Sequence, residues 1–217
     1  MKGRTLLVVS AFALLVCGCL AQAGEWWEAF QVKGYLQTDF HIVPETGFDL
    51  RRGYLGVEGQ LTDQDFVKLI GNFSIRDNEM KVKLQDGYLV HSFNDQFSAR
   101  LGFAPHMLNW EGPYSSSSRP FLERSYASSK FDPGEQELGL LLTRSSQRAW
   151  DPEIMVGYSN GMQSWHEKGA TDGEAFLVRL DLPFGQKSLV GASYRSAWQE
   201  AGARHSEDCL NFHVVYN

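Results

Sequence analysis

Apolar and polar side chains alternate strictly along residues 30–41. One set reads Phe, Val, Gly, Leu, Thr, Phe, and the set between them reads Gln, Lys, Tyr, Gln, Asp, His. Neighbouring residues of a β-strand point to opposite faces, whereas a helix would spread both sets around its axis. The stretch therefore predicts a β-strand with one apolar face and one polar face.

Strand patterns of this kind recur along the rest of the chain. They predict about ten strands, at 30–41, 52–61, 67–74, 81–92, 97–103, 137–143, 154–159, 175–182, 188–196 and 209–216. Residues that favour tight turns separate several of them, at 62–65, 77–78, 94–95, 160–161 and 183–185. No pattern after residue 23 indicates a helix of three turns. We therefore expect an all-β, antiparallel, up-and-down fold.

Residues 1–23 have the three parts of a secretory signal peptide. Lys2 and Arg4 form a short basic end, residues 6–16 form an apolar run, and Ala21-Gln22-Ala23 offers small residues for cleavage. The apolar run is shorter than the roughly 20 residues of a membrane-spanning helix. We therefore expect the leader to be removed and the rest of the chain to be exported.

The exported part, residues 24–217, is long enough for one domain with a sizeable core. Cys17 and Cys19 lie in the leader, so Cys209 alone remains and cannot form an intrachain disulfide. A rival interpretation of the leader is lipidation at Cys19. The chain has 20 basic and 26 acidic residues, a balance that disfavours nucleic-acid binding.

Two architectures bury one face of each strand: a transmembrane β-barrel around a wet lumen, and a soluble β-sandwich. The strands at 30–41 and 52–61 are longer than usual sandwich strands, and charged residues such as Lys33, Asp39 and Glu58 lie on their polar faces. Aromatic residues gather toward strand ends, as in the girdles of a barrel, although a soluble core would produce the same pattern. We predict an outer-membrane barrel in contact with lipid; the alternative is a periplasmic or surface sandwich that binds a ligand or partner.

A series of short motifs follows the predicted strands in order. They read RRGYLGVEG at 51–59, LQDGYL at 84–89, RLGFAP at 100–105, FLERS at 121–125, FDPG at 131–134, LGL at 138–140 and GYSNG at 157–161. In this order they resemble the phosphate-selective porin O/P family of bacterial outer-membrane porins. The resemblance implies a passive pore for small hydrophilic solutes or anions, no cofactor, and a homotrimer.

The same resemblance implies a barrel of roughly sixteen strands, of which this chain would supply the N-terminal half. We therefore expect the domain to be truncated at its C-terminal end. The alternative is that the ten strands close into a narrow barrel, because an open sheet edge is not stable in a bilayer.

Three arginines have the parity of the polar faces of their strands: Arg52, Arg100 and Arg179. We predict that they line the pore. The alternative is that they are solvated strand residues paired with acids such as Glu58 and Asp181.

The long segment at 106–135 is predicted to fold inward and narrow the pore, with Arg119, Glu123, Arg124 and Lys130 as the residues at the constriction. Anion selectivity requires a cluster of positive side chains, and acidic residues outnumber basic ones in this segment. The family's phosphate preference is therefore not carried over. A surface loop without a role in the channel is the alternative.

Catalysis is not expected, although Gly157-Tyr158-Ser159-Asn160-Gly161 spells Gly-x-Ser-x-Gly. That motif acts from a strand-to-helix elbow, and Asn160-Gly161 instead predicts a turn at the end of a strand. The histidines lack the spacing of metal ligands, so no metal site is expected either.

Overall fold

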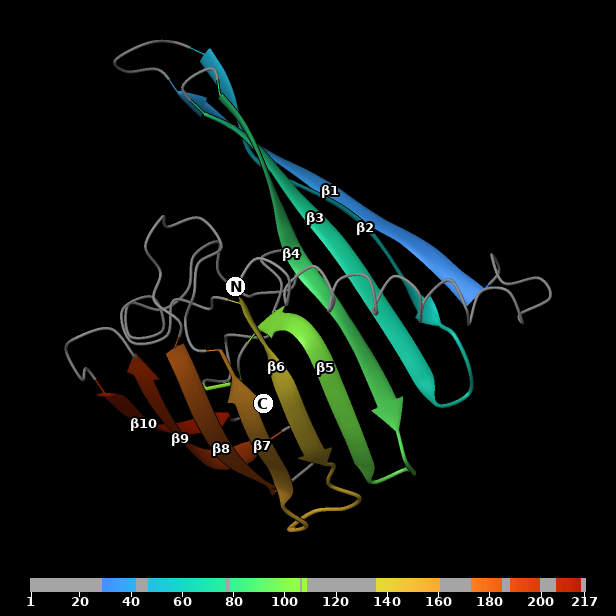
Figure 1. Ribbon diagram of the computed structural model, residues 1–217, viewed down its shortest axis with the longest axis vertical. Coiled ribbons are helices and arrows are strands. Elements are labelled where there is room, and N and C mark those ends of the chain that lie inside the picture. Colours follow the sequence, from blue (N-terminus) through green and yellow to red (C-terminus); the bar gives the residue numbers. More distant parts are fainter. Residues whose placement is uncertain are drawn as a thin grey trace.

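Ten antiparallel β-strands form one sheet in the computed structural model (Figure 1). The structure describes residues 29–41, 47–76, 79–105, 107–108, 136–160, 173–184, 188–199 and 206–215. Each strand pairs with the next one along the chain, so the sheet is an up-and-down meander with β1 and β10 at its two edges. The predicted all-β, antiparallel, up-and-down arrangement is confirmed.

The strands are β1 (Phe30–His41), β2 (Gly47–Gln60), β3 (Asp65–Arg76), β4 (Glu79–Ser92), β5 (Phe97–Pro105), β6 (Gln136–Arg144), β7 (Glu153–Ser159), β8 (Gly173–Pro183), β9 (Leu189–Gln199) and β10 (Ser206–Val215). All ten predicted strands are present, and β1 has the predicted bounds. The largest error is in β2, which begins at Gly47 and not at residue 52. In the described part of the chain, no helix has the length and apolar character needed to cross a membrane.

The connections between strands fall at two opposite ends of the sheet. At one end, here called the short-turn end, the connections span 61–64, 93–96, 145–152 and 184–188. The opposite, long-loop end has the two longest connections, at 106–135 and 160–172. The first residue of β1 and the last residue of β10 both lie at the short-turn end, as their pairing with Gly59 and Leu189 shows. β1–β4 project beyond the other strands at the long-loop end (Figure 1).

Side chains close two of the short turns. The Thr62 hydroxyl accepts hydrogen bonds from the backbone N–H groups of Gln64 and Asp65, at 3.2 and 3.0 Å. In the same way, Asn94 Oδ1 accepts from the N–H groups of Gln96 and Phe97, each at 2.9 Å. Threonine and asparagine favour turns because their side chains can replace a backbone acceptor in this way. The turns predicted at these two places are confirmed.

The connection between β6 and β7 is held by one carboxylate. Asp151 accepts from Arg144 Nη2 at 2.8 Å and from the backbone N–H of Gln147 at 2.9 Å. The hydrogen bond from Gln147, and next to it the one from Arg144, lower the pKa of Asp151 because they stabilise its charged form. This turn is therefore a fixed link between neighbouring strands.

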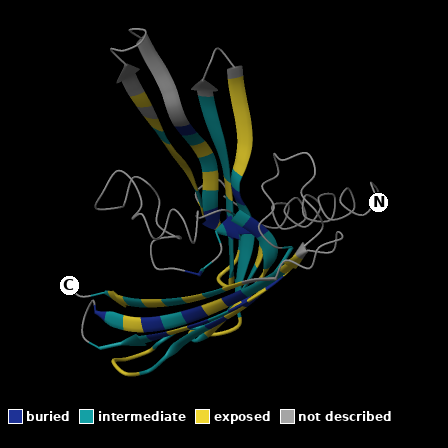
Figure 2. Ribbon diagram, turned by 90° about the vertical axis from the view of Figure 1, so that its left-hand side faces the viewer, coloured by how far each residue is buried: buried dark blue, intermediate teal, exposed yellow. Residues whose placement is uncertain are grey.

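The sheet has an apolar face and a polar face, as the alternation predicts. Register places the following exposed side chains on the apolar face: Val32, Leu36, Leu55, Val57, Leu69, Val82, Leu84, Leu101, Leu140, Leu142, Val156, Leu180, Val190, Leu210, Phe212 and Val214. Figure 2 shows buried and exposed residues alternating along the strands of a curved sheet. The apolar face is exposed, and many of the described buried residues are charged or polar, although ordinarily such residues are mostly exposed.

Candidate functional site

The buried charges are concentrated on the polar face of β6–β10. Glu137, Arg179, Asp181, Ser193 and Arg195 are all buried there. A buried charge is strongly unfavourable unless it is paired and hydrogen-bonded. The partners of these five side chains therefore define the candidate site.

One network joins three strands through Glu137. Its carboxylate accepts from Arg195 Nη2 at 2.5 Å and from the Ser159 hydroxyl at 2.5 Å. Arg195 is on β9 and Glu137 is on β6, so the guanidinium reaches across β7 and β8. Ala175, which pairs with Ser159 in register, has only a methyl side chain on β8, one of the two strands that the contact crosses.

A second network joins β8 to β10 through Asp181. The Arg179 guanidinium donates to Asp181 Oδ2 from Nε at 2.9 Å and from Nη2 at 2.7 Å. The other carboxylate oxygen, Oδ1, lies 2.9 Å from His213 Nε2. The contact with His213 crosses β9 at Gly191, where an added Cβ would collide with both Asp181 and His213. Glycine at this position is therefore a requirement of the network.

Gly191→Ala is expected to lower the free energy of unfolding by about 1–3 kcal/mol, because the new methyl group must displace a hydrogen-bonded pair. Denaturant titration of the folded protein measures the change. Gly71→Ala is the matched control, since a Cβ there would first meet the ring tip of Phe73 at 3.3 Å, which can move. Equal losses in the two variants would contradict the role assigned to Gly191.

The chain that follows β5 lies on the same polar face. The Arg179 guanidinium donates from Nη1 to the Met107 carbonyl at 3.1 Å, and the Ser193 hydroxyl donates to the Leu108 carbonyl. The Leu108 side chain packs into an apolar cluster with Leu141, Met155 and Leu177, and only 2% of it is exposed. Residues 107–108 are the described start of the segment that is predicted to fold inward.

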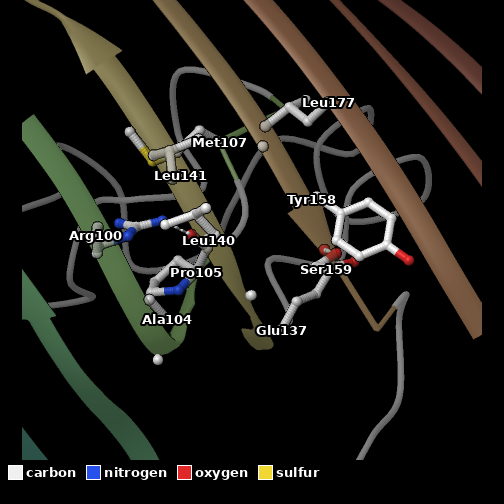
Figure 3. Close-up of a pocket in the computed structure, with 13 residues that line it drawn as sticks. Arg100, Ala104, Pro105, Met107, Glu137, Leu140, Leu141, Tyr158, Ser159 and Leu177 are labelled. Atoms are coloured by element: carbon white, nitrogen blue, oxygen red, sulfur yellow. Dashed lines mark hydrogen bonds between the residues drawn. The ribbon is translucent and has the colours of Figure 1, made fainter.

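A small cavity opens beside this segment (Figure 3). Its lining includes Arg100, Pro105, Met107, Glu137 and Ser159. Arg100 Nη2 donates to the Pro105 carbonyl at 2.8 Å, and its guanidinium lies 5.5 Å from the centre of the Tyr88 ring. The cavity measures about 40 Å³, which is room for water molecules.

Of the three arginines predicted to line a pore, Arg100 and Arg179 lie on the polar face. Arg179 is paired with Asp181, as the alternative supposed, but it is 4% exposed and therefore not a solvated strand residue. For Arg52 only the backbone is described, where it pairs with Gln37, and its side chain lies outside the described part. Arg119, Glu123, Arg124 and Lys130 also lie outside the described residues, so their role at a constriction stays a prediction.

Sequence reasoning did not identify Glu137, Ser193 or Arg195 as members of a site. Their strand parity was an available signal, since a polar residue at a position predicted to face the lumen marks a candidate. Their pairing was not available, because the contact between Glu137 and Arg195 crosses two intervening strands.

The polar face of β1–β5 also has charges of both signs. Lys33 lies 3.4 Å from Glu58, and Lys68 lies 3.0 Å from Asp86. Groups of both signs thus lie on this face, and the cations at these two positions are paired with acids.

The serine of the Gly-x-Ser-x-Gly motif is in β7, and its hydroxyl donates to Glu137. Asp181 and His213 contact each other and not this serine's hydroxyl, which is bonded to Glu137. Gly161 lies outside the described residues. Within the described ranges, no group of three or more His, Cys, Asp or Glu side chains could hold a metal ion.

No protein-family model matches the chain, and comparison with curated proteins gives no match. The resemblance to the phosphate-selective porin O/P family therefore rests on the motifs in the sequence.

Proposed function

We propose that the chain forms the wall of an outer-membrane β-barrel and acts as a passive channel for small hydrophilic solutes or ions. The observation that carries the proposal is the exposed apolar face. It extends over all ten strands, from Val32 on β1 to Val214 on β10. An apolar surface of this extent requires a cover, and lipid covers the outer surface of a membrane barrel.

The distribution of aromatic residues supports a membrane as the cover. Most exposed aromatic side chains lie toward the short-turn end, at Phe93, Phe97 and Trp150, or toward the long-loop end, at Tyr158, Phe176 and Trp198; Tyr194 and Phe212 lie farther from the strand ends. Barrels in membranes have aromatic girdles at both interfaces and an aliphatic band between them. The two groups of aromatic residues fit these girdles.

The two edges of the sheet require partners in this proposal. Unpaired backbone N–H and C=O groups are unfavourable by several kcal/mol each in hydrocarbon. β1 and β10 must therefore pair in the membrane, either with each other or with further strands. The resemblance to trimeric porins further suggests that three barrels assemble.

The polar face would line the lumen. Lys33, Lys68, Arg179 and Arg195 each lie within ion-pair distance of a carboxylate. Anion selectivity needs unbalanced positive charge near the path of the solute. We therefore propose that these four cations do not by themselves make the channel anion-selective.

The proposal is tested by expression in a Gram-negative host with the native leader. We expect the protein in the outer-membrane fraction, resistant to extraction with high salt, and stepwise conductance after the purified protein is added to a planar lipid bilayer. A mock preparation, made in the same way from cells without the gene, is the control and should show no conductance steps. Recovery from the soluble periplasmic fraction would overturn the proposal and favour a binding protein.

A further inference from the structure

We propose that Arg179 and Ser193 are positioning residues, which hold Met107 and Leu108 against the polar face and so set the width of the passage. This inference rests on the proposed function, because a passage exists only if the sheet closes around a lumen. The contacts that support it belong to the described structure and do not depend on closure.

The first support is that side chains donate hydrogen bonds to three backbone carbonyls at the end of β5 and just after it. Pro105, Met107 and Leu108 offer their carbonyl oxygens to Arg100, Arg179 and Ser193, respectively. Buried carbonyl groups need such partners, and a strand would supply them from a neighbouring backbone. Here three strands, β5, β8 and β9, supply them from side chains, so residues of the sheet hold the chain at Pro105, Met107 and Leu108.

The second support is an apolar interruption of the polar face. Leu141, Met155 and Leu177 lie on the polar face of β6, β7 and β8, where alternation calls for polar residues. Gly157 pairs with both Leu141 and Leu177, and the Leu141 side chain packs over it, since a Cβ at Gly157 would lie 3.1 Å from Leu141 Cδ1. The Leu108 side chain fills this apolar cluster. Leucines facing a wet lumen would be unfavourable, so the cluster is explained by the residue that covers it.

The third support is the way in which Arg179 is itself held. Asp181 accepts two hydrogen bonds from its guanidinium, which leaves Nη1 directed at the Met107 carbonyl. His213 contacts the same carboxylate from β10. A buried arginine fixed on two sides is suited to holding a backbone group in one place.

These contacts keep Met107 and Leu108 on the polar face, where they would occupy part of the lumen of a closed barrel. Without them, the chain after Pro105 could follow the rim at the long-loop end. The passage beside β6–β9 would then be wider, and the apolar cluster would be exposed to water.

The test uses Cys209, which packs against the same apolar cluster and is not in a disulfide. In the full-length protein, the rate at which a membrane-impermeant maleimide modifies Cys209 is measured by peptide mass spectrometry. We expect the double substitution Arg179→Met and Ser193→Ala to raise this rate about tenfold, because release of Leu108 uncovers the thiol. Lys68→Met, which removes a cation from β3, is the matched control and should leave the rate unchanged.

A second variant guards against a general loss of folding. Leu108→Ser changes a residue outside the strands and leaves every wall residue in place. It should also raise the rate about tenfold, since it removes the apolar side chain that covers the cluster. Rates equal to that of Lys68→Met in both variants would overturn the proposal.

Conductance separates this inference from the proposed function. If the unsubstituted protein forms channels, both variants should show a larger single-channel conductance, and an unchanged conductance would refute control of the width. If the unsubstituted protein forms no channel, the proposed function fails and control of a passage fails with it. Thiol modification would then still decide whether Arg179 and Ser193 position the chain.

Discussion

Leu101→Arg is expected to lower the stability of the protein in a lipid bilayer by about 2–4 kcal/mol, because the charge would enter hydrocarbon near the midplane. Leu101 is the central residue of β5, is 54% exposed, and pairs with Leu89 and Leu140 on the apolar face. In a soluble protein, the same change at a half-exposed position would alter the stability by no more than about 0.5 kcal/mol. Urea titration of the protein folded in phospholipid vesicles, followed by tryptophan fluorescence, measures the difference.

The control for this experiment lies on the same strand. Ser98→Arg places a guanidinium on the polar face of β5, which already holds Arg100. It should change the stability by less than about 1 kcal/mol, since the polar face is in contact with water in the proposed barrel. Two equally mild substitutions would show that no lipid covers the apolar face.

Arg195→Met is expected to destabilise the protein by about 3–5 kcal/mol, because it leaves the Glu137 carboxylate buried without its ionic partner. The Arg195 and Glu137 side chains are 4% and 6% exposed, so water cannot readily replace the lost guanidinium. Adding Glu137→Leu should restore the stability to within about 1 kcal/mol of the original, since a buried pair can be replaced by apolar residues with little loss. Denaturant titrations of the two single variants and the double variant form the cycle that measures this coupling.

The exposed ion pair of Lys33 and Glu58 provides the contrast. The Lys33 side chain is 49% exposed, so Lys33→Met should change the stability by at most about 1 kcal/mol. A loss in Arg195→Met no larger than this would mean that the Glu137–Arg195 contact is solvated.

β2 illustrates how far local pattern predicts a strand. The prediction began at residue 52, whereas β2 begins at Gly47. In the pairing with β1, Gln37 lies opposite Arg52 and Thr38 lies opposite Leu50, so Arg51 is an extra residue in β2. Such a bulge reverses the parity of every residue beyond it and hides the start of the strand from a search for alternation. The pairing that reveals it comes from a different strand.

For the arginines of the candidate site, too, the sequence predicts one feature and not another: it predicts the strand face but not the contact partners. The parity of Arg100 and Arg179 could be read from their own strands, because alternation depends only on the neighbouring residues. Their hydrogen-bond partners could not be predicted from the strand sequences. Arg100 donates to the Pro105 carbonyl, and Arg179 donates to the Met107 carbonyl as well as to Asp181. These contacts depend on the path of the chain after β5.

The sequence by itself determined the number and order of the strands and the face on which most of their side chains lie. These features follow from a period of two residues and from turn-forming side chains, both of which act over a few residues of chain. Only the tertiary structure decided that Glu137 meets Arg195, that Asp181 meets His213 across Gly191, and that Leu108 covers an apolar cluster on the polar face. Those contacts join strands that are not neighbours in the sheet, or join the wall to a connection. They therefore depend on register and on the curvature of the sheet, which no single stretch of sequence encodes.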